Sequence, residues 1–202
     1  MTKRILLAGV LAGIAMFLWS GLAHDVLFLG RTGIQELPNE ATVLGPMQST
    51  LGSSSGLYIY PGLGLGPNPT REQEKAAMAG YQAKLAANPS GLLIYHPSGG
   101  EALSSRQLIT EFLTELVEAF LAVFLLARAR IGSFVGRVGF VTVIGILAAI
   151  TTNVPYWNWY GFPVNYTFAY MSIEIIGFLV AGLVAAAIVK NEPVAQKLKM
   201  AA

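Results

Sequence analysis

Residues 5–23 read ILLAGVLAGIAMFLWSGLA, and this stretch decides the class of fold. It contains no charged side chain, and at about 1.5 Å per helical residue it is long enough to cross a hydrocarbon core of about 30 Å. Lys3 and Arg4 precede it. One narrow stripe at helical spacing contains Gly9, Gly13, Met16 and Ser20. Such a stripe predicts a face for packing against another helix.

The same pattern also describes a cleavable signal peptide, with the small residues Gly21 and Ala23 near a cleavage position. The apolar region of a usual leader has about 7–15 residues, and this one is longer. We therefore favour a first membrane-spanning helix within residues 1–25. Cleavage stays open as the alternative.

The composition agrees with a membrane protein. Hydrophobic residues make up 54% of the 202 residues and charged residues only 12%, against about 25% charged in soluble domains. The chain has no cysteine, which excludes disulfides, thiolate catalysis and cysteine metal sites. Basic residues do not cluster outside the membrane-flanking segments, so nucleic acid is not indicated as a partner.

The next segment, residues 26–105, is rich in Gly, Pro, Ser and Asn and has no apolar run long enough to span a membrane. Residues 38–51 predict a short helix interrupted by Gly45 and Pro46. Thr70 and Gln73 predict a capping box that begins a second helix, which Pro89 ends.

Two short runs within this segment, 56–62 (GLYIYPG) and 91–100 (GLLIYHPSGG), resemble each other and predict a pair of strands. The result is a small α+β segment with a thin core. We expect it to be stabilised by packing against membrane helices or against a partner.

Residues 106–202 contain three further apolar segments. The first reads LITEFLTELVEAFLAVFLLA and follows a capping box made by Ser104 and Gln107. The others cover about 138–153 and 166–189. The predicted fold class is a mainly α membrane protein with four transmembrane helices, in which the α+β segment lies outside the cytoplasm between the first two helices.

The distribution of positive charge sets the orientation, because short loops rich in Lys and Arg stay in the cytoplasm. Four crossings place eight of the 13 basic residues on one side: Lys3, Arg4, Arg128, Arg130, Arg137, Lys190, Lys197 and Lys199. We therefore expect a multi-pass protein with both termini in the cytoplasm.

The aromatic sequence VPYWNWYGFPVNYTF, residues 154–168, is expected to form an outer loop between the last two helices. Indole and phenol rings favour the headgroup level of a bilayer. The expected interfacial anchor consists of Tyr156, Trp157, Trp159 and Tyr160. The alternative is a surface for a ligand or a partner, since contiguous aromatics also occur at interfaces.

Acidic residues lie within the apolar helices. Glu111, Glu115 and Glu118 share one face of the second membrane helix by their spacing, and Glu174 lies about two turns into the fourth. A carboxyl group at such depth must be protonated, paired or turned to the bundle interior. The functional hypothesis is a candidate intramembrane acidic site, which would bind a cation or relay protons, made of Glu111, Glu115, Glu118, Glu174 and His24.

The alternative is that these carboxyl groups hydrogen-bond to Thr114, Asn153 and tyrosines and only fix the register of the helices. A metal site from His24, Asp25 and the glutamates would suit zinc or manganese, but the spacing is not diagnostic. The metal and any cofactor stay undetermined.

Three stretches, KRILLAGVLAGIAMFLWSGLAH, GLLIYHPSGG and YWNWYGFP, resemble a group of bacterial inner-membrane proteins with no assigned activity. The resemblance covers nearly the whole chain and implies a bacterial inner-membrane setting. It implies nothing about mechanism.

The function that the sequence favours is a non-enzymatic accessory or scaffold subunit of a membrane assembly. The thin soluble segment and a small-residue stripe of Gly177, Ala181 and Ala185 motivate this expectation, with the bilayer and either a second copy or another membrane protein as partners. The alternative is a cation- or proton-handling protein that uses the carboxylates. The sequence GSSSG matches G-x-S-x-G with Ser54, but its surroundings read as a turn, so an enzyme is not favoured.

Overall fold

The computed structural model describes residues 2–190 and divides the chain into two compact units. The helical unit contains the residues up to Gln35 and those from Leu103 on, and the extramembrane unit contains Glu36–Ala102. Residues 26–35 belong to the helical unit, because the short turn Leu29–Arg31 within them packs on the last long helix. Lys197 and Lys199, which the orientation argument uses, lie outside the described residues.

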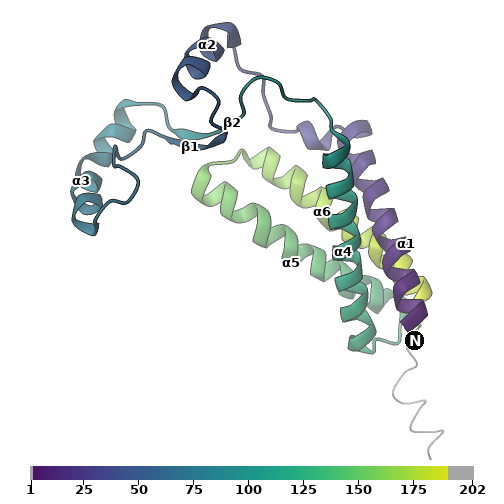
Figure 1. Cartoon of the computed structure of the whole chain (residues 1–202). Coiled ribbons are helices and arrows are strands. Elements are labelled where there is room, and N and C mark those ends of the chain that lie inside the picture. Colours follow the sequence, from purple (N-terminus) through teal and green to yellow (C-terminus); the bar gives the residue numbers. More distant parts are fainter. Residues whose placement is uncertain (1, 191–202) are drawn as a thin grey trace, which may run out of the picture. The chain divides into compact units, whose positions relative to one another are not determined.

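The helical unit is built from four long helices, α1, α4, α5 and α6 (Figure 1). Two short turns, η1 and η2, follow the first of them. The elements are α1 (Thr2–Gly21), the π-helical turn η1 (Leu22–Val26), the 3-10 turn η2 (Leu29–Arg31), α4 (Ser105–Ala129), α5 (Phe134–Tyr160) and α6 (Val164–Ile188). Helix α1 packs against both α4 and α6, and α6 packs against α5, whereas α4 makes few contacts with α5 and α6.

Three stretches of the described chain are long and apolar enough to cross a membrane: Lys3–Val26, Phe134–Tyr160 and Val164–Ile188. For these three, the predicted apolar segments are confirmed as helices long and apolar enough to span a membrane. Helix α4 does not qualify, since every 18-residue stretch of it carries at least three charged side chains from Arg106, Glu111, Glu115, Glu118 and Arg128.

Small residues set the close approach of the helices, as the glycine stripe of α1 predicts. A Cβ atom added to Gly13 would lie 2.9 Å from the Cα atom of Leu116 in α4, and one added to Gly9 would meet the ring of Phe120. In the other pair, the backbone of Gly182 in α6 lies against Val141 of α5. The core of the unit therefore consists mainly of alanine and other small apolar side chains.

Helix α5 differs from the expectation at its C-terminal end. It continues through the aromatic residues to Tyr160, with Pro155 inside it, and only residues 161–163 link it to α6. The expected outer loop is thus mostly helical. Gly161 ends the helix because it adopts a φ of 71°, and its backbone N–H donates to the carbonyl of Trp157.

The extramembrane unit contains α2 (Glu40–Leu51), β1 (Gly56–Tyr60), α3 (Arg71–Ala87) and β2 (Gly91–Tyr95). The predicted helices and strands are confirmed, including the capping box of Thr70 and Gln73. The strands pair antiparallel, with Leu57 opposite Ile94 and Ile59 opposite Leu92. Tyr95 is the one buried side chain in this unit, so its core is as thin as predicted.

Candidate functional site

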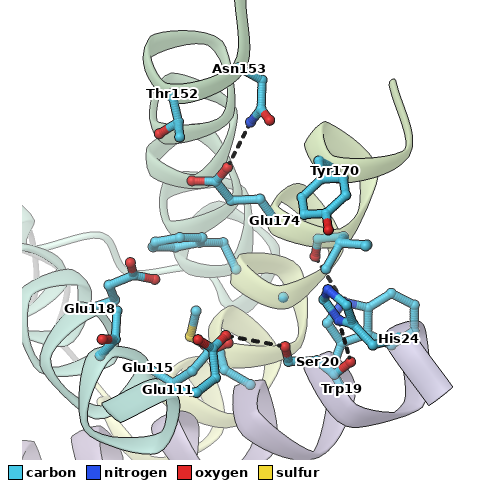
Figure 2. A pocket seen from close by; sticks show the side chains of 15 residues that line it. Trp19, Ser20, His24, Glu111, Glu115, Glu118, Thr152, Asn153, Tyr170 and Glu174 are labelled. Atoms are coloured by element: carbon cyan, nitrogen blue, oxygen red, sulfur yellow. Dashed lines mark hydrogen bonds between the residues drawn. The ribbon is translucent and has the colours of Figure 1, made fainter. Parts of the chain in front are cut away.

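A cavity of about 310 Å³ lies between the helices of the helical unit. Figure 2 shows the side chains that line it. All five residues of the predicted acidic site are among them: Glu111, Glu115, Glu118, Glu174 and His24. The helices α4, α6 and the turn after α1 thus bring together groups that lie up to 150 positions apart in sequence, counted from His24 to Glu174.

Helix α4 supplies three of the carboxylates because positions i, i+4 and i+7 fall on one face. Glu111 is exposed, and Glu115 and Glu118 are half-buried. The hydroxyl of Ser20 on α1 donates to Glu111 Oε1 at 3.5 Å. This face of α4 borders the cavity where α4 and α5 make few contacts.

Helix α6 supplies Glu174, which has a fixed partner. The side-chain nitrogen of Asn153 donates to Glu174 Oε2 at 3.2 Å and to the carbonyl of Ala149 at 3.0 Å. Asn153 is buried on α5, so this bond ties α5 to α6 beside the cavity (Figure 2). The hydrogen-bonding alternative from the sequence names Asn153 and Thr114 as partners of the carboxyl groups. Asn153 does bond to Glu174, whereas the hydroxyl of Thr114 donates to the carbonyl of Thr110.

The π-helical turn η1 places His24 on the cavity wall. His24 Nδ1 donates to the carbonyl of Ser20 at 2.9 Å, since a carbonyl can only accept. In this tautomer the other ring nitrogen, Nε2, carries the lone pair. The ring lies so close to Gly30 that a Cβ atom at that position would collide with it, and π-helical turns are often found at functional sites.

Aromatic side chains connect His24 with the end of α5. The rings follow one another as Tyr156, Phe162, Tyr166, Tyr170 and His24, with centroid separations between 4.3 and 5.9 Å. Tyr170 also donates from its hydroxyl to the carbonyl of Gly30 at 3.3 Å. The predicted anchor is thus continuous with one wall of the cavity.

The anchor residues themselves are exposed at the C-terminal end of α5. Trp159 is 78% exposed, and Tyr156, Trp157 and Tyr160 are each about half exposed. Large aromatic rings that are about half exposed or more suit the boundary between lipid and water.

Sequence reasoning missed several residues of the site, among them two aromatic ones, Trp19 and Phe178. Trp19 lines the cavity and donates from Nε1 to the carbonyl of Ile173 at 2.8 Å, which links α1 to α6. Phe178 covers one wall and packs against Gly145. Neither has a sequence signal beyond an aromatic ring in an apolar helix.

The charges of the cavity have one sign. Its described lining contains four glutamates and no lysine or arginine. Carboxylates around a small cavity repel one another when ionised, and a cation among them removes that repulsion. Within residues 2–190, no group of three or more His, Asp or Glu side chains is close enough to hold a metal ion between them.

This fold and this site define a class, a mainly helical protein with three helices fit to span a membrane and a carboxylate-lined cavity between its helices. Comparison with models of protein families, with curated proteins and with solved structures gives no match. The function is therefore argued from the site itself.

Proposed function

We propose that the chain is a cation-handling membrane protein, which binds a cation or passes protons at the cavity of the helical unit. The observation that carries this proposal is the set of four glutamates and His24 around one cavity, with no basic side chain in its described lining other than the histidine. Glutamates in membrane segments commonly belong to ion or proton pathways. Trp19 and Tyr170 add aromatic faces to the same wall, and such faces also attract cations.

The proposal includes α4 as a fourth span. Its 25 residues correspond to about 37 Å of helix. Its carboxylates face the cavity, while Leu113, Val117 and Leu121 are more than half exposed on another face. A helix with polar groups inward and apolar groups outward can cross lipid at acceptable cost.

Four crossings place the extramembrane unit on one side and the basic residues around α4 and α5 on the other. The positive-inside rule then assigns the unit to the outer side of a bacterial inner membrane and both termini to the cytoplasm. Arg128 and Arg130 support this orientation, because they flank the turn between α4 and α5.

The cation is expected to keep bound water or to be a proton. The carboxylates surround the cavity without converging on one point, and a volume of 310 Å³ holds about ten waters at roughly 30 Å³ each. A hydrated monovalent cation needs no tight cage of ligands.

Substitution of the cavity glutamates tests the proposal. Glu115→Gln and Glu118→Gln keep the shape of each side chain and remove its charge. In proteoliposomes, uptake of radioactive sodium or rubidium, or of protons followed with an enclosed pH dye, is expected to fall by about tenfold, equivalent to ~1.4 kcal/mol of lost attraction.

Glu101→Gln is the matched control, because Glu101 is exposed in the extramembrane unit. It makes the same chemical change away from the cavity and should leave uptake unchanged. If the uptake of every tested cation stays at the wild-type level in both cavity variants, the cation-handling proposal is refuted.

The second candidate is an accessory or scaffold subunit. The thin core of the extramembrane unit favours it, since Tyr95 alone is buried there. It predicts that the full chain co-purifies with a second copy or another membrane protein in mild detergent. A strictly monomeric species in native membranes would contradict it.

A further inference from the structure

Two aromatic side chains of the cavity wall have already used their polar hydrogens. Trp19 donates from Nε1 to the carbonyl of Ile173 at 2.8 Å, and Tyr170 donates from its hydroxyl to the carbonyl of Gly30 at 3.3 Å. Both side chains line the cavity (Figure 2) and are only partly buried. Because these bonds hold both side chains in place, the surface that they offer to a ligand is mainly aromatic ring.

The four carboxyl groups of the cavity differ in their partners. Ser20 donates to the first of them along α4, and Asn153 donates to the one on α6. No group within residues 2–190 donates a hydrogen bond to the carboxyl oxygens of Glu115 or Glu118. Both are half-buried, and a carboxylate taken partly out of water needs hydrogen-bond donors or a positive charge in its place. They are therefore the acceptors that a ligand can use.

Glu115 and Glu118 lie three positions apart on α4, so their side chains are neighbours, with Cβ atoms about 5–6 Å apart. A primary ammonium group carries a positive charge and hydrogen-bond donors and has no acceptor. It therefore suits two neighbouring acceptors of negative charge. Within the described residues, the acidic and histidine side chains do not converge as in a metal site, so the ammonium group can keep part of its water.

The aromatic wall favours an ammonium ion that has an organic body. A hydrated inorganic ion leaves the ring surface in contact with water, whereas an alkyl chain covers that surface, which is favourable. The rings also attract the positive charge itself. The cavity volume of about 310 Å³ corresponds to about ten waters at roughly 30 Å³ each. This is enough for a short alkylammonium ion with some of its water.

We propose that the cation of the cavity is a small primary ammonium ion with an alkyl body. Its head binds between Glu115 and Glu118, and its body lies on the rings of Trp19 and Tyr170. This inference rests on the proposed cation-handling function and names the class of cation.

Competition for binding tests the chemical class in the unchanged protein. Radioactive n-butylammonium is bound to the purified full-length chain in detergent, and unlabelled compounds compete with it. Unlabelled n-butylammonium should displace it best. Methylammonium and rubidium, which lack the longer alkyl chain, should need at least about tenfold higher concentrations. The alcohol n-butanol, which lacks the charge, should not compete at comparable concentrations.

Substitutions locate the site of this binding. Glu115→Gln and Glu118→Gln should each weaken the binding of n-butylammonium about tenfold, because each removes a charged acceptor. Glu101→Gln is the matched control in the extramembrane unit and should leave binding unchanged. Trp19→Leu should weaken binding about fivefold through loss of the ring, and Trp19→Phe, which keeps a ring, should weaken it less.

Methylammonium that competes as well as n-butylammonium would overturn the proposal, because the alkyl body would then contribute nothing. Wild-type binding in both glutamine variants would overturn it as well. Uptake of rubidium or protons that depends on Glu115 and Glu118, without saturable binding of n-butylammonium, would refute this inference alone and leave the cation-handling function standing. If neither class of cation depends on these glutamates, both proposals fail.

Discussion

At the scale of single residues, Arg137 is the clearest case of a charge whose role depends on its surroundings. It is only 6% exposed. One terminal nitrogen of its guanidinium donates to the carbonyl of Gly132 at 2.6 Å and the other to that of Ala186 at 3.1 Å. It therefore ties the turn between α4 and α5 to the last turn of α6, where a positive charge also favours the helix dipole.

Arg137→Lys is expected to destabilise the helical unit by ~2 kcal/mol, because one ammonium group cannot reproduce a fork of donors to separate carbonyls. Arg128→Lys is the matched control, since Arg128 is exposed and lies over the ring of Phe124. Thermal unfolding in detergent compares the two variants. Equal melting temperatures would show that the contacts of Arg137 contribute nothing to stability.

At the scale of elements, the packing of α1 on α4 depends on residues without side chains. The backbone of Leu116 occupies the space where a side chain on Gly13 would be. A larger residue would have to push the helices apart, which reduces the contact of every side chain between them.

Gly13→Ala is therefore expected to cost ~1–3 kcal/mol of stability. Gly21→Ala, on the same helix, is expected to be neutral, because nothing lies within 4 Å of a Cβ atom added there. The measurement is the midpoint of unfolding by a denaturing detergent. A Gly13→Ala variant as stable as the Gly21→Ala variant would contradict this packing.

At the scale of the whole molecule, the proposed architecture requires that α4 crosses the bilayer. With four crossings, the extramembrane unit and the turn between α4 and α5 lie on opposite sides. If α4 does not cross, they lie on the same side.

Single cysteines at Ala79 and Ala129, the latter exposed at the end of α4, distinguish these arrangements. An impermeant maleimide added to intact cells should label Ala79→Cys, and should label Ala129→Cys only after the membrane is made permeable. Identical labelling of both positions would exclude the four-span topology.

The sequence predicted the elements well where the signal is local. The capping boxes at Thr70 and Ser104 begin α3 and α4 as expected, since a cap needs only four neighbouring residues. The pairing of 56–62 with 91–100 followed from their likeness and their turn-rich flanks. The C-terminal extension of α5 was not predicted, because Pro155 and the aromatic run are typical of a loop.

By itself, the sequence determined that this protein has helices long and apolar enough to span a membrane, a small α+β unit after the first of them and carboxylates on one face of α4. These follow from composition and spacing along one helix. Only the tertiary structure decided that Glu174, His24 and Trp19 border the same cavity as those carboxylates, and that Arg137 is buried. Such tertiary contacts depend on which faces of distant helices touch. The spacing of residues within one helix cannot specify the rotation or tilt of its neighbours.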